Sequence, residues 1–225
     1  MRMIYVGRRY FSFFLVPVIL LANSLLTHEP ILQLANKIII VDAGHGGVDT
    51  GANRPGILEK NINLAVALQL KTILNQYGAK VVLSRQEDIE LSSECDDERV
   101  RGRYHRDLAA RIELVEESDA DIFISIHANA VGNAKRHGAE VFYYAKSEQG
   151  KLLANTIQTE LHKITHTPAT ASPGNYFVLR RNKIPAALIE IGYITNSDER
   201  RLLQTADYQN KLAETIALGI CNYYQ

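Results

Sequence analysis

Four side chains of this sequence have the residue types that a hydrolytic zinc site needs. His45 lies in the glycine-rich run DAGHGG, and His127 lies at the end of the apolar stretch DIFISIH. Two carboxylates accompany them: Glu59 stands just before a helical pattern, and Glu190 lies inside the apolar run LIEIG. Zinc in hydrolases binds imidazole nitrogens and a carboxylate oxygen and leaves one position for water. Two histidines and one of these carboxylates therefore predict an open catalytic zinc site, with the second carboxylate beside it.

Each of these residues also has a purely structural interpretation. A histidine at the end of a strand is commonly held by ordinary hydrogen bonds, and Glu190 fits a core carboxylate that pairs with a cation. Burying a carboxylate in an apolar strand costs free energy unless a partner compensates it, and this cost favours a functional role. The residue types alone leave open which carboxylate binds the metal and which one takes part in the reaction.

The elements that must position these residues alternate along the chain between apolar strands and amphipathic helices. Strands are expected at residues 37–41, 79–84, 121–127, 139–144, 176–179 and 186–191. Helices are expected at residues 61–77, 107–117, 147–165 and 208–223. This alternation predicts a single α/β domain, with a mostly parallel twisted sheet and helices on both faces. Because ligands of such sheets gather at the carboxyl ends of the strands, we expect the four polar residues to meet there.

The N-terminal segment has the pattern of an export signal. Arg2, Arg8 and Arg9 precede an uncharged apolar run that extends over residues 10–26. A positive segment followed by an apolar run is typical of a signal peptide or a membrane signal anchor, and the arginines stay on the cytoplasmic side. We therefore divide the chain into a signal peptide or anchor (residues 1–27), a linker (28–36) and a catalytic domain (37–225).

Composition excludes several other classes of protein. Lys plus Arg and Asp plus Glu are both 25, so the chain has no excess of basic residues with which to bind nucleic acid. Cys95 and Cys221 are too few for a disulfide framework, and we expect two unpaired thiols. The sequence thus indicates an exported globular domain that binds no nucleic acid.

Four segments together resemble a known family. They are VDAGHGGVDTGA (41–52), ILEKNINLAVALQLKTIL (57–74), DIFISIHANA (121–130) and PAALIEIGYITNSDE (185–199). In this order they are similar to the zinc-dependent N-acetylmuramoyl-L-alanine amidases of type 3. Within that family, a short anchored chain without further domains is most similar to the germination-specific, spore-cortex type. The resemblance extends from about Lys37 to the C-terminus.

The resemblance implies a role for each candidate residue. His45, Glu59 and His127 would be the ligands of Zn²⁺, and Glu190 would be the catalytic carboxylate. The implied reaction on peptidoglycan is cleavage of the amide between N-acetylmuramic acid and L-alanine of the stem peptide, in cortex processing towards muramic-δ-lactam. The enzyme would then act on the extracytoplasmic face of the bacterial membrane or in the cell wall, attached through its N-terminal segment.

The sequence also departs from the family, and two other functions stay open. Ala43 stands where the first motif usually has proline, and the short segment between His127 and Glu140 has no room for the inhibitory helix of some division amidases. Control would then lie in expression, in metal loading or in an envelope regulatory protein. The alternatives are a zinc peptidase that cuts within the stem peptide and a non-catalytic, membrane-tethered wall-binding protein.

Overall fold

The computed structural model describes residues 32–225. The expected export segment (1–27) and residues 28–31 of the expected linker lie outside the described residues. Leu34 is fully buried, and its N–H donates to the carbonyl of Tyr77 at 3.0 Å. The packed domain therefore begins at this residue. Within residues 32–225, no helix is long and apolar enough to cross a membrane.

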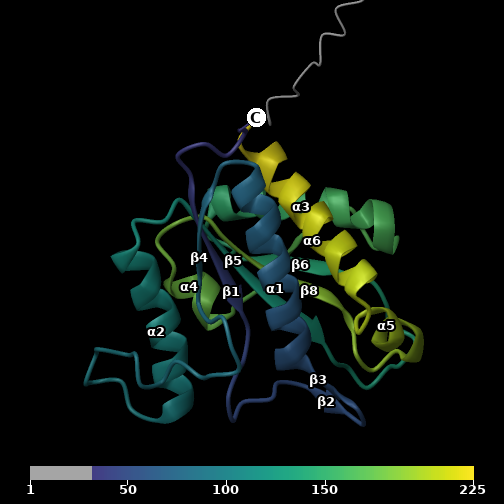
Figure 1. Cartoon of the computed structure of the whole chain (residues 1–225), viewed down its shortest axis with the longest axis horizontal. Helices are drawn as coiled ribbons and strands as arrows, with labels where there is room; N and C mark the ends of the chain where they lie inside the picture. Colours follow the sequence, from purple (N-terminus) through teal and green to yellow (C-terminus); the bar gives the residue numbers. More distant parts are fainter. Residues whose placement is uncertain (1–31) are drawn as a thin grey trace, which may run out of the picture.

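A six-stranded sheet forms the centre of the domain, with the strand order β4-β1-β5-β8-β6-β7 (Figure 1). Its strands, in chain order, are β1 (Ile38–Ala43), β4 (Lys80–Leu83), β5 (Ile122–Asn129), β6 (Glu140–Tyr143), β7 (Ser172–Pro173) and β8 (Ala186–Tyr193). Every neighbouring pair is parallel except β6 and β8, which are antiparallel. The expected single domain with a mostly parallel sheet is confirmed.

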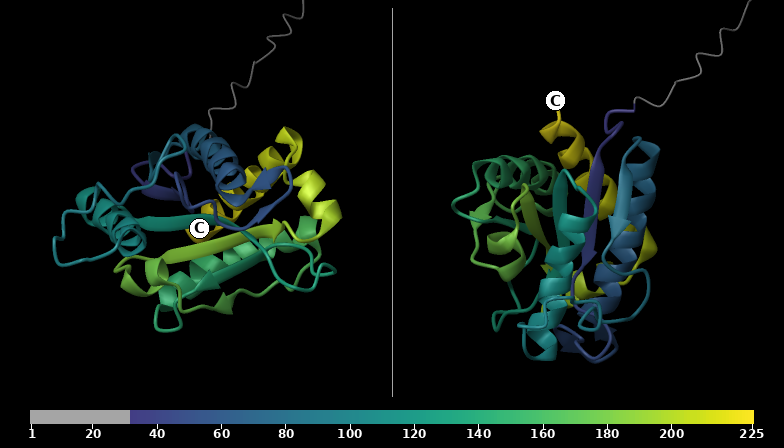
Figure 2. Two further views of the ribbon diagram at one scale, coloured as in Figure 1. Left: turned by 90° about the horizontal axis from the view of Figure 1, so that it is seen from below. Right: turned by 90° about the vertical axis from the view of Figure 1, so that its left-hand side faces the viewer.

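The helices cover both faces of this sheet (Figure 2). They are α1 (Glu59–Gln76), α2 (Arg103–Glu117), α3 (Glu148–Thr165), α4 (Phe177–Arg181), α5 (Ser197–Leu202) and α6 (Ala206–Tyr223). On one face α6 packs between α1 and α3, and Figure 1 shows α1 and α6 side by side. Their apolar stripes bury strand residues such as Val41, Ile124 and Ile189. These three helices therefore enclose the larger of the hydrophobic cores.

The opposite face of the sheet, which we call the site face, has much less cover. Successive strand residues alternate between the faces, so Ile40, Phe123 and Leu188 point to this side, where they pack with residues of α2 and α4. The same alternation places His127 and Glu190 on the site face, further towards the carboxyl ends of their strands. Helices α2 and α4 leave an open pocket at this end of the sheet, and polar side chains can meet there.

One expected strand is wrong. Residues 176–179 were assigned to a strand, but Phe177–Arg181 form the helix α4. A short apolar run does not by its pattern distinguish a strand from a turn of helix. Val178 and Leu179 are both buried in the core of the site face. In a strand, two consecutive side chains point to opposite sides, whereas a turn of helix lying on the sheet lets both contact the same core. The strand beside β6, at one edge of the sheet, is β7 instead, within the expected loop 167–174.

Other differences concern boundaries and short elements. Helix α1 begins two residues earlier than expected, at Glu59, and α2 begins four residues earlier, at Arg103. Helix α5 and the small antiparallel hairpin of β2 (Asn53–Arg54) and β3 (Ile57–Leu58) are not predicted by the sequence pattern. Cys95 and Cys221 are buried and unpaired, as expected.

Candidate metal centre

The hairpin and the ends of two strands bring three of the four candidate residues together. His45 lies two residues after β1, and His127 lies near the end of β5, the strand beside β1. The β2–β3 hairpin reverses the chain and places Glu59 next to Ala52, whose carbonyl accepts from the Glu59 N–H at 3.0 Å. Glu59 is the first residue of α1, and the hairpin places it beside the ends of β1 and β5.

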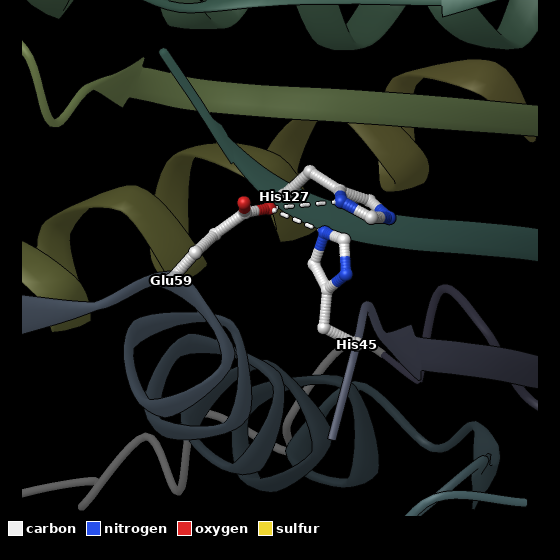
Figure 3. Close-up of side chains that lie close together, drawn as sticks. All are labelled: His45, Glu59 and His127. Carbon is white, nitrogen blue, oxygen red and sulfur yellow. Dashed lines mark hydrogen bonds and ion pairs between the residues drawn. The ribbon is translucent and has the colours of Figure 1, made fainter. Parts of the chain in front are cut away.

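His45, Glu59 and His127 point towards one another (Figure 3). The Glu59 Oε1 atom is 3.1 Å from Nε2 of His45 and 3.0 Å from Nδ1 of His127. One ligand atom from each residue lies within 4.8 Å of the other two. Two imidazole nitrogens and a carboxylate oxygen, from three separate elements, are the donor set of a catalytic zinc site.

Hydrogen bonds from the backbone hold Glu59 in this place. Its Oε2 atom accepts from the N–H of Ala52 at 2.7 Å, and its Oε1 atom accepts from the N–H of Ala128 at 3.2 Å. The side-chain amide of Asn63, one helical turn further along α1, also donates to Oε1 at 3.2 Å. The carboxylate is only 6% exposed, so its direction is fixed by the fold.

Asp49 orients His45, and the sequence analysis missed it. The Asp49 Oδ2 atom lies 2.8 Å from Nδ1 of His45, while Oδ1 accepts from the N–H of Gly51 at 3.0 Å. A carboxylate on the far nitrogen of a ligand histidine fixes its tautomer and strengthens the nitrogen that faces the metal. The signal was present in the sequence, because Asp49 follows His45 by four residues in the first motif.

Two glycines make room for these side chains. A Cβ atom on Gly44 would lie 2.2 Å from Nε2 of His127, and one on Gly51 would lie 2.5 Å from Oε2 of Glu59. Gly51 also has a φ of +62°, which disfavours any other residue. The donor set and this cradle together fit a bound zinc ion.

Replacing Gly44 by alanine is expected to weaken zinc binding by at least about 10-fold, as loss of a group that orients a ligand does. The new methyl group would push the His127 ring away from Glu59, because the backbone of Gly44 is held by the Ile126 carbonyl at 3.0 Å. Gly132→Ala is the matched control, since nothing lies within 4 Å of its added Cβ. Chelator competition measures the zinc affinity of both variants. Equal affinities would contradict the role of Gly44 in making room for the His127 ring.

The charges of the metal-free cluster are strongly coupled. Although burial raises the pKa of Glu59, hydrogen bonds and charges of His127 and His45 hold that pKa well below its usual range. Burial lowers the pKa of His45, but Glu59 and Asp49 outweigh it and raise the pKa to about 9. The site thus keeps an ionised carboxylate between two imidazoles, and a divalent cation that binds there releases protons.

Glu190 lies beside this cluster, on the adjacent strand. It is paired in register with His127 between β5 and β8. Burial raises its pKa to about 7; the nearby His127 opposes this shift and Glu59 adds to it. Its Oε2 atom is buried and accepts no hydrogen bond within residues 32–225. A carboxylate with a raised pKa and an unused oxygen has the properties of a proton carrier near neutral pH.

An open pocket with a cavity volume of about 110 Å³ adjoins the candidate ligands. Its polar wall contains the candidate ligands His45 and His127 together with Asp42, Asp49, Asp107 and Arg111. The rest is mostly apolar and is formed by residues of α2, of β8 and of the segment containing α4: Tyr104, Leu108, Tyr176, Phe177, Val178 and Leu188. An apolar cleft with a few convergent polar groups is typical of a substrate site. The pocket gives a substrate access to the cluster.

The fold and the site define a class of protein: an α/β domain with a candidate hydrolytic metal centre at the carboxyl edge of its sheet. Comparison with known proteins is more specific. The family model described as N-acetylmuramoyl-L-alanine amidase matches residues 39–222. The chain belongs to this family, so the resemblance noted in the sequence is confirmed.

Individual relatives agree with this assignment. The chain is 38% identical over 195 residues to the germination-specific N-acetylmuramoyl-L-alanine amidase of Bacillus subtilis, covering 86% of this chain and 82% of the relative. Among solved structures, it is similar to the CwlD amidase from Clostridioides difficile in complex with the GerS lipoprotein, with 38% identity, a TM-score of 0.77 and coverage of 84% and 98%. The catalytic domain of CwlV from Bacillus (Paenibacillus) polymyxa has 34% identity and a TM-score of 0.68, covering 83% of this chain and 97% of that domain.

Proposed function

We propose that this amidase depends on zinc, held by His45, Glu59 and His127, and that it cleaves the amide between the lactyl group of N-acetylmuramic acid and L-alanine. The observation that carries the proposal is the convergence of three ligand atoms within 4.8 Å at the side of an open pocket. The donor types fit zinc, and Asp49 supports His45 as the outer partner of a ligand histidine does.

In the proposed reaction, Glu190 carries a proton from the attacking water to the leaving nitrogen. A zinc ion bound at the cluster supplies Lewis acidity towards the carbonyl of the substrate. Glu190 accepts a proton from the attacking water and delivers it to the alanine nitrogen as the carbon–nitrogen bond breaks. A pKa of about 7 suits both halves of this task, because the group must take up the proton and then release it.

The second part of the proposal is the biological substrate. The relative from Bacillus subtilis is a germination-specific amidase, which supports the peptidoglycan of the spore cortex as the substrate. Cleavage leaves a free lactyl carboxyl group on the glycan, the group that a separate deacetylase would need to form muramic-δ-lactam. Spores of a deletion strain are expected to lack muramic-δ-lactam in muropeptide analysis, and a normal lactam content would contradict this role.

The third part of the proposal is a regulatory protein of the envelope that binds this domain. The Clostridioides difficile relative was solved in complex with a lipoprotein, which supports a partner of that kind for this chain. We expect co-elution of the purified domain with a lipoprotein similar to GerS from its own organism. Separate elution in size-exclusion chromatography would contradict this part of the proposal.

The proposed location of the domain rests on the export pattern of the N-terminal segment. We propose that residues 1–27 direct the domain through the membrane and that residues 37–225 act outside. Residues 28–36 link the two, with Leu34 already packed into the core of the domain. A C-terminal fusion to a reporter active only after export is expected to be active, and replacing Arg2, Arg8 and Arg9 by acidic residues should reduce its activity. A fusion that is active only as a cytoplasmic reporter would contradict this topology.

The products released from purified peptidoglycan test the reaction itself. We expect stem peptides with a free L-alanine amino group and glycan strands with a free lactyl carboxyl, and no products in the presence of a chelator. Free D-alanine or short peptides, with the lactyl amide intact, would indicate a peptidase. If the protein binds peptidoglycan but releases no product from it, it is a wall-binding protein.

A further inference from the structure

We infer that Arg111 is a positioning residue for the metal centre: its guanidinium fixes the backbone of His45 so that the imidazole faces Glu59. This inference rests on the proposed zinc site and names a residue of α2 that lies at the wall of the pocket and acts on the metal site through the backbone of His45. The conformation of His45 and four contacts of Arg111 indicate this role.

His45 has an unusual backbone conformation. Its φ is +63°, in the left-handed region that residues other than glycine rarely adopt. Such a conformation persists only where surrounding groups hold it. Asp49 orients the ring through Nδ1, but this contact does not define the direction of the His45 peptide. On one side of the His45–Gly46 peptide, the Gly46 N–H donates to the Asp49 carbonyl at 2.9 Å. On the other side, the carbonyl of His45 needs a donor of its own to complete the hold on this backbone.

Arg111 contacts the backbone at this point. Its Nη2 atom donates to the His45 carbonyl at 3.0 Å, and its Nη1 atom donates to the Ala43 carbonyl at 3.1 Å. Within residues 32–225, no other side chain donates a hydrogen bond to the His45 carbonyl. The guanidinium therefore holds the two residues that flank Gly44 in one orientation.

Two carboxylates hold the guanidinium in turn. Asp42 pairs with Nη1, and Asp107 accepts from Nε at 2.9 Å. The Ser125 hydroxyl donates to the other oxygen of Asp42 at 2.7 Å, and Asp107 Oδ1 accepts from the N–H of Leu91 at 2.7 Å. Arg111 is 2% exposed and Asp42 is 1% exposed, so this arrangement has little freedom to move.

Only an arginine can make all of these contacts. The guanidinium has five N–H donors in a rigid planar fork, whereas a lysine ammonium is a compact charge on a flexible chain. Lysine at position 111 can pair with Asp42 but cannot also reach Asp107 and both carbonyls. Arg85, the other buried arginine nearby, donates to the carbonyls of Ala43 and Gly44 but not to that of His45.

The test separates positioning from a general contribution to stability. Arg111→Lys is expected to weaken zinc binding by about 10- to 100-fold, the usual cost of losing a group that orients a ligand. The control is Gln158→Met: Gln158 is equally buried, on α3 at the opposite face of the sheet, and bonds to Val141, Ala139 and Thr167. It should lower Tm and leave the zinc affinity unchanged. Chelator competition gives the affinities, and calorimetry of the metal-free proteins gives Tm.

A folded Arg111→Lys variant with the zinc affinity of the unaltered protein would overturn the inference. So would an equal loss of affinity in Gln158→Met, because the effect would then follow stability alone. If Arg111→Lys does not fold, Asp107→Asn loosens the guanidinium and should weaken zinc binding several-fold, and an unchanged affinity there would also overturn it. If the unaltered protein binds no zinc, the proposed metal site fails, which is a distinct outcome.

Discussion

Replacing Glu190 by glutamine is expected to reduce kcat by at least about 10²-fold, the usual cost of losing a positioned acid–base group. Glutamine keeps the shape of the side chain and removes only its ability to accept a proton. The cluster of His45, Glu59 and His127 does not include Glu190, so zinc content and Tm should stay as they are. Steady-state kinetics on purified peptidoglycan, with elemental analysis of the same sample, measure both.

Glu140 provides the matched control for this experiment. It lies opposite Glu190 in the antiparallel register of β6 and β8, and its carboxylate pairs with Arg136. Glu140→Gln makes the same chemical change one strand away. Because the charge of Glu140 adds less to the raised pKa of Glu190 than burial and Glu59 do, the variant should leave kcat within a few-fold. Loss of zinc in Glu190→Gln would show that Glu190 is a metal ligand, and equal kcat losses in the two variants would remove its special role.

Replacing His127 by alanine is expected to abolish zinc binding and to lower activity by about 10³-fold or more, because Lewis-acid stabilisation contributes several kcal/mol. Only His45 and Glu59 would remain, and two protein ligands are fewer than the three that catalytic zinc sites use. The expected protein is folded but no longer stabilised by added zinc in a thermal melt.

His137→Ala is the control, since this histidine is exposed and lies on the loop after β5. It should retain one zinc per chain after dialysis and full activity. A full equivalent of zinc in His127→Ala, measured by elemental analysis, would mean that the ligand set proposed from the geometry is wrong.

The fold is predictable from the sequence where the periodicity of apolar residues is strong. Buried strands such as β1 and β5 are nearly continuous apolar runs, and long helices such as α3 repeat their apolar residues every three or four positions, so both were recognised. Helix α4 was not, because its five residues are too few to show a period and its helical form depends on packing against the sheet.

For the site, the sequence predicted the residue types but not their supporting partners. His45 and His127 stand out because each follows an apolar strand, and Glu59 because it precedes a helix. The role of Arg111 depends on contacts with residues 66 to 69 positions away, which no local pattern reveals. The distance between Glu59 and His127 is likewise set by the hairpin and the sheet, not by spacing in the chain.

The central claim is that water attacks the lactyl carbonyl, and the most direct measurement is where the oxygen of that water appears. We expect digestion of purified peptidoglycan in water labelled with heavy oxygen to place one labelled atom in the lactyl carboxyl of the glycan product and none in the stem peptide. Mass spectrometry of both products shows this. A label in a carboxyl group of the peptide, with the lactyl amide intact, would contradict the claim.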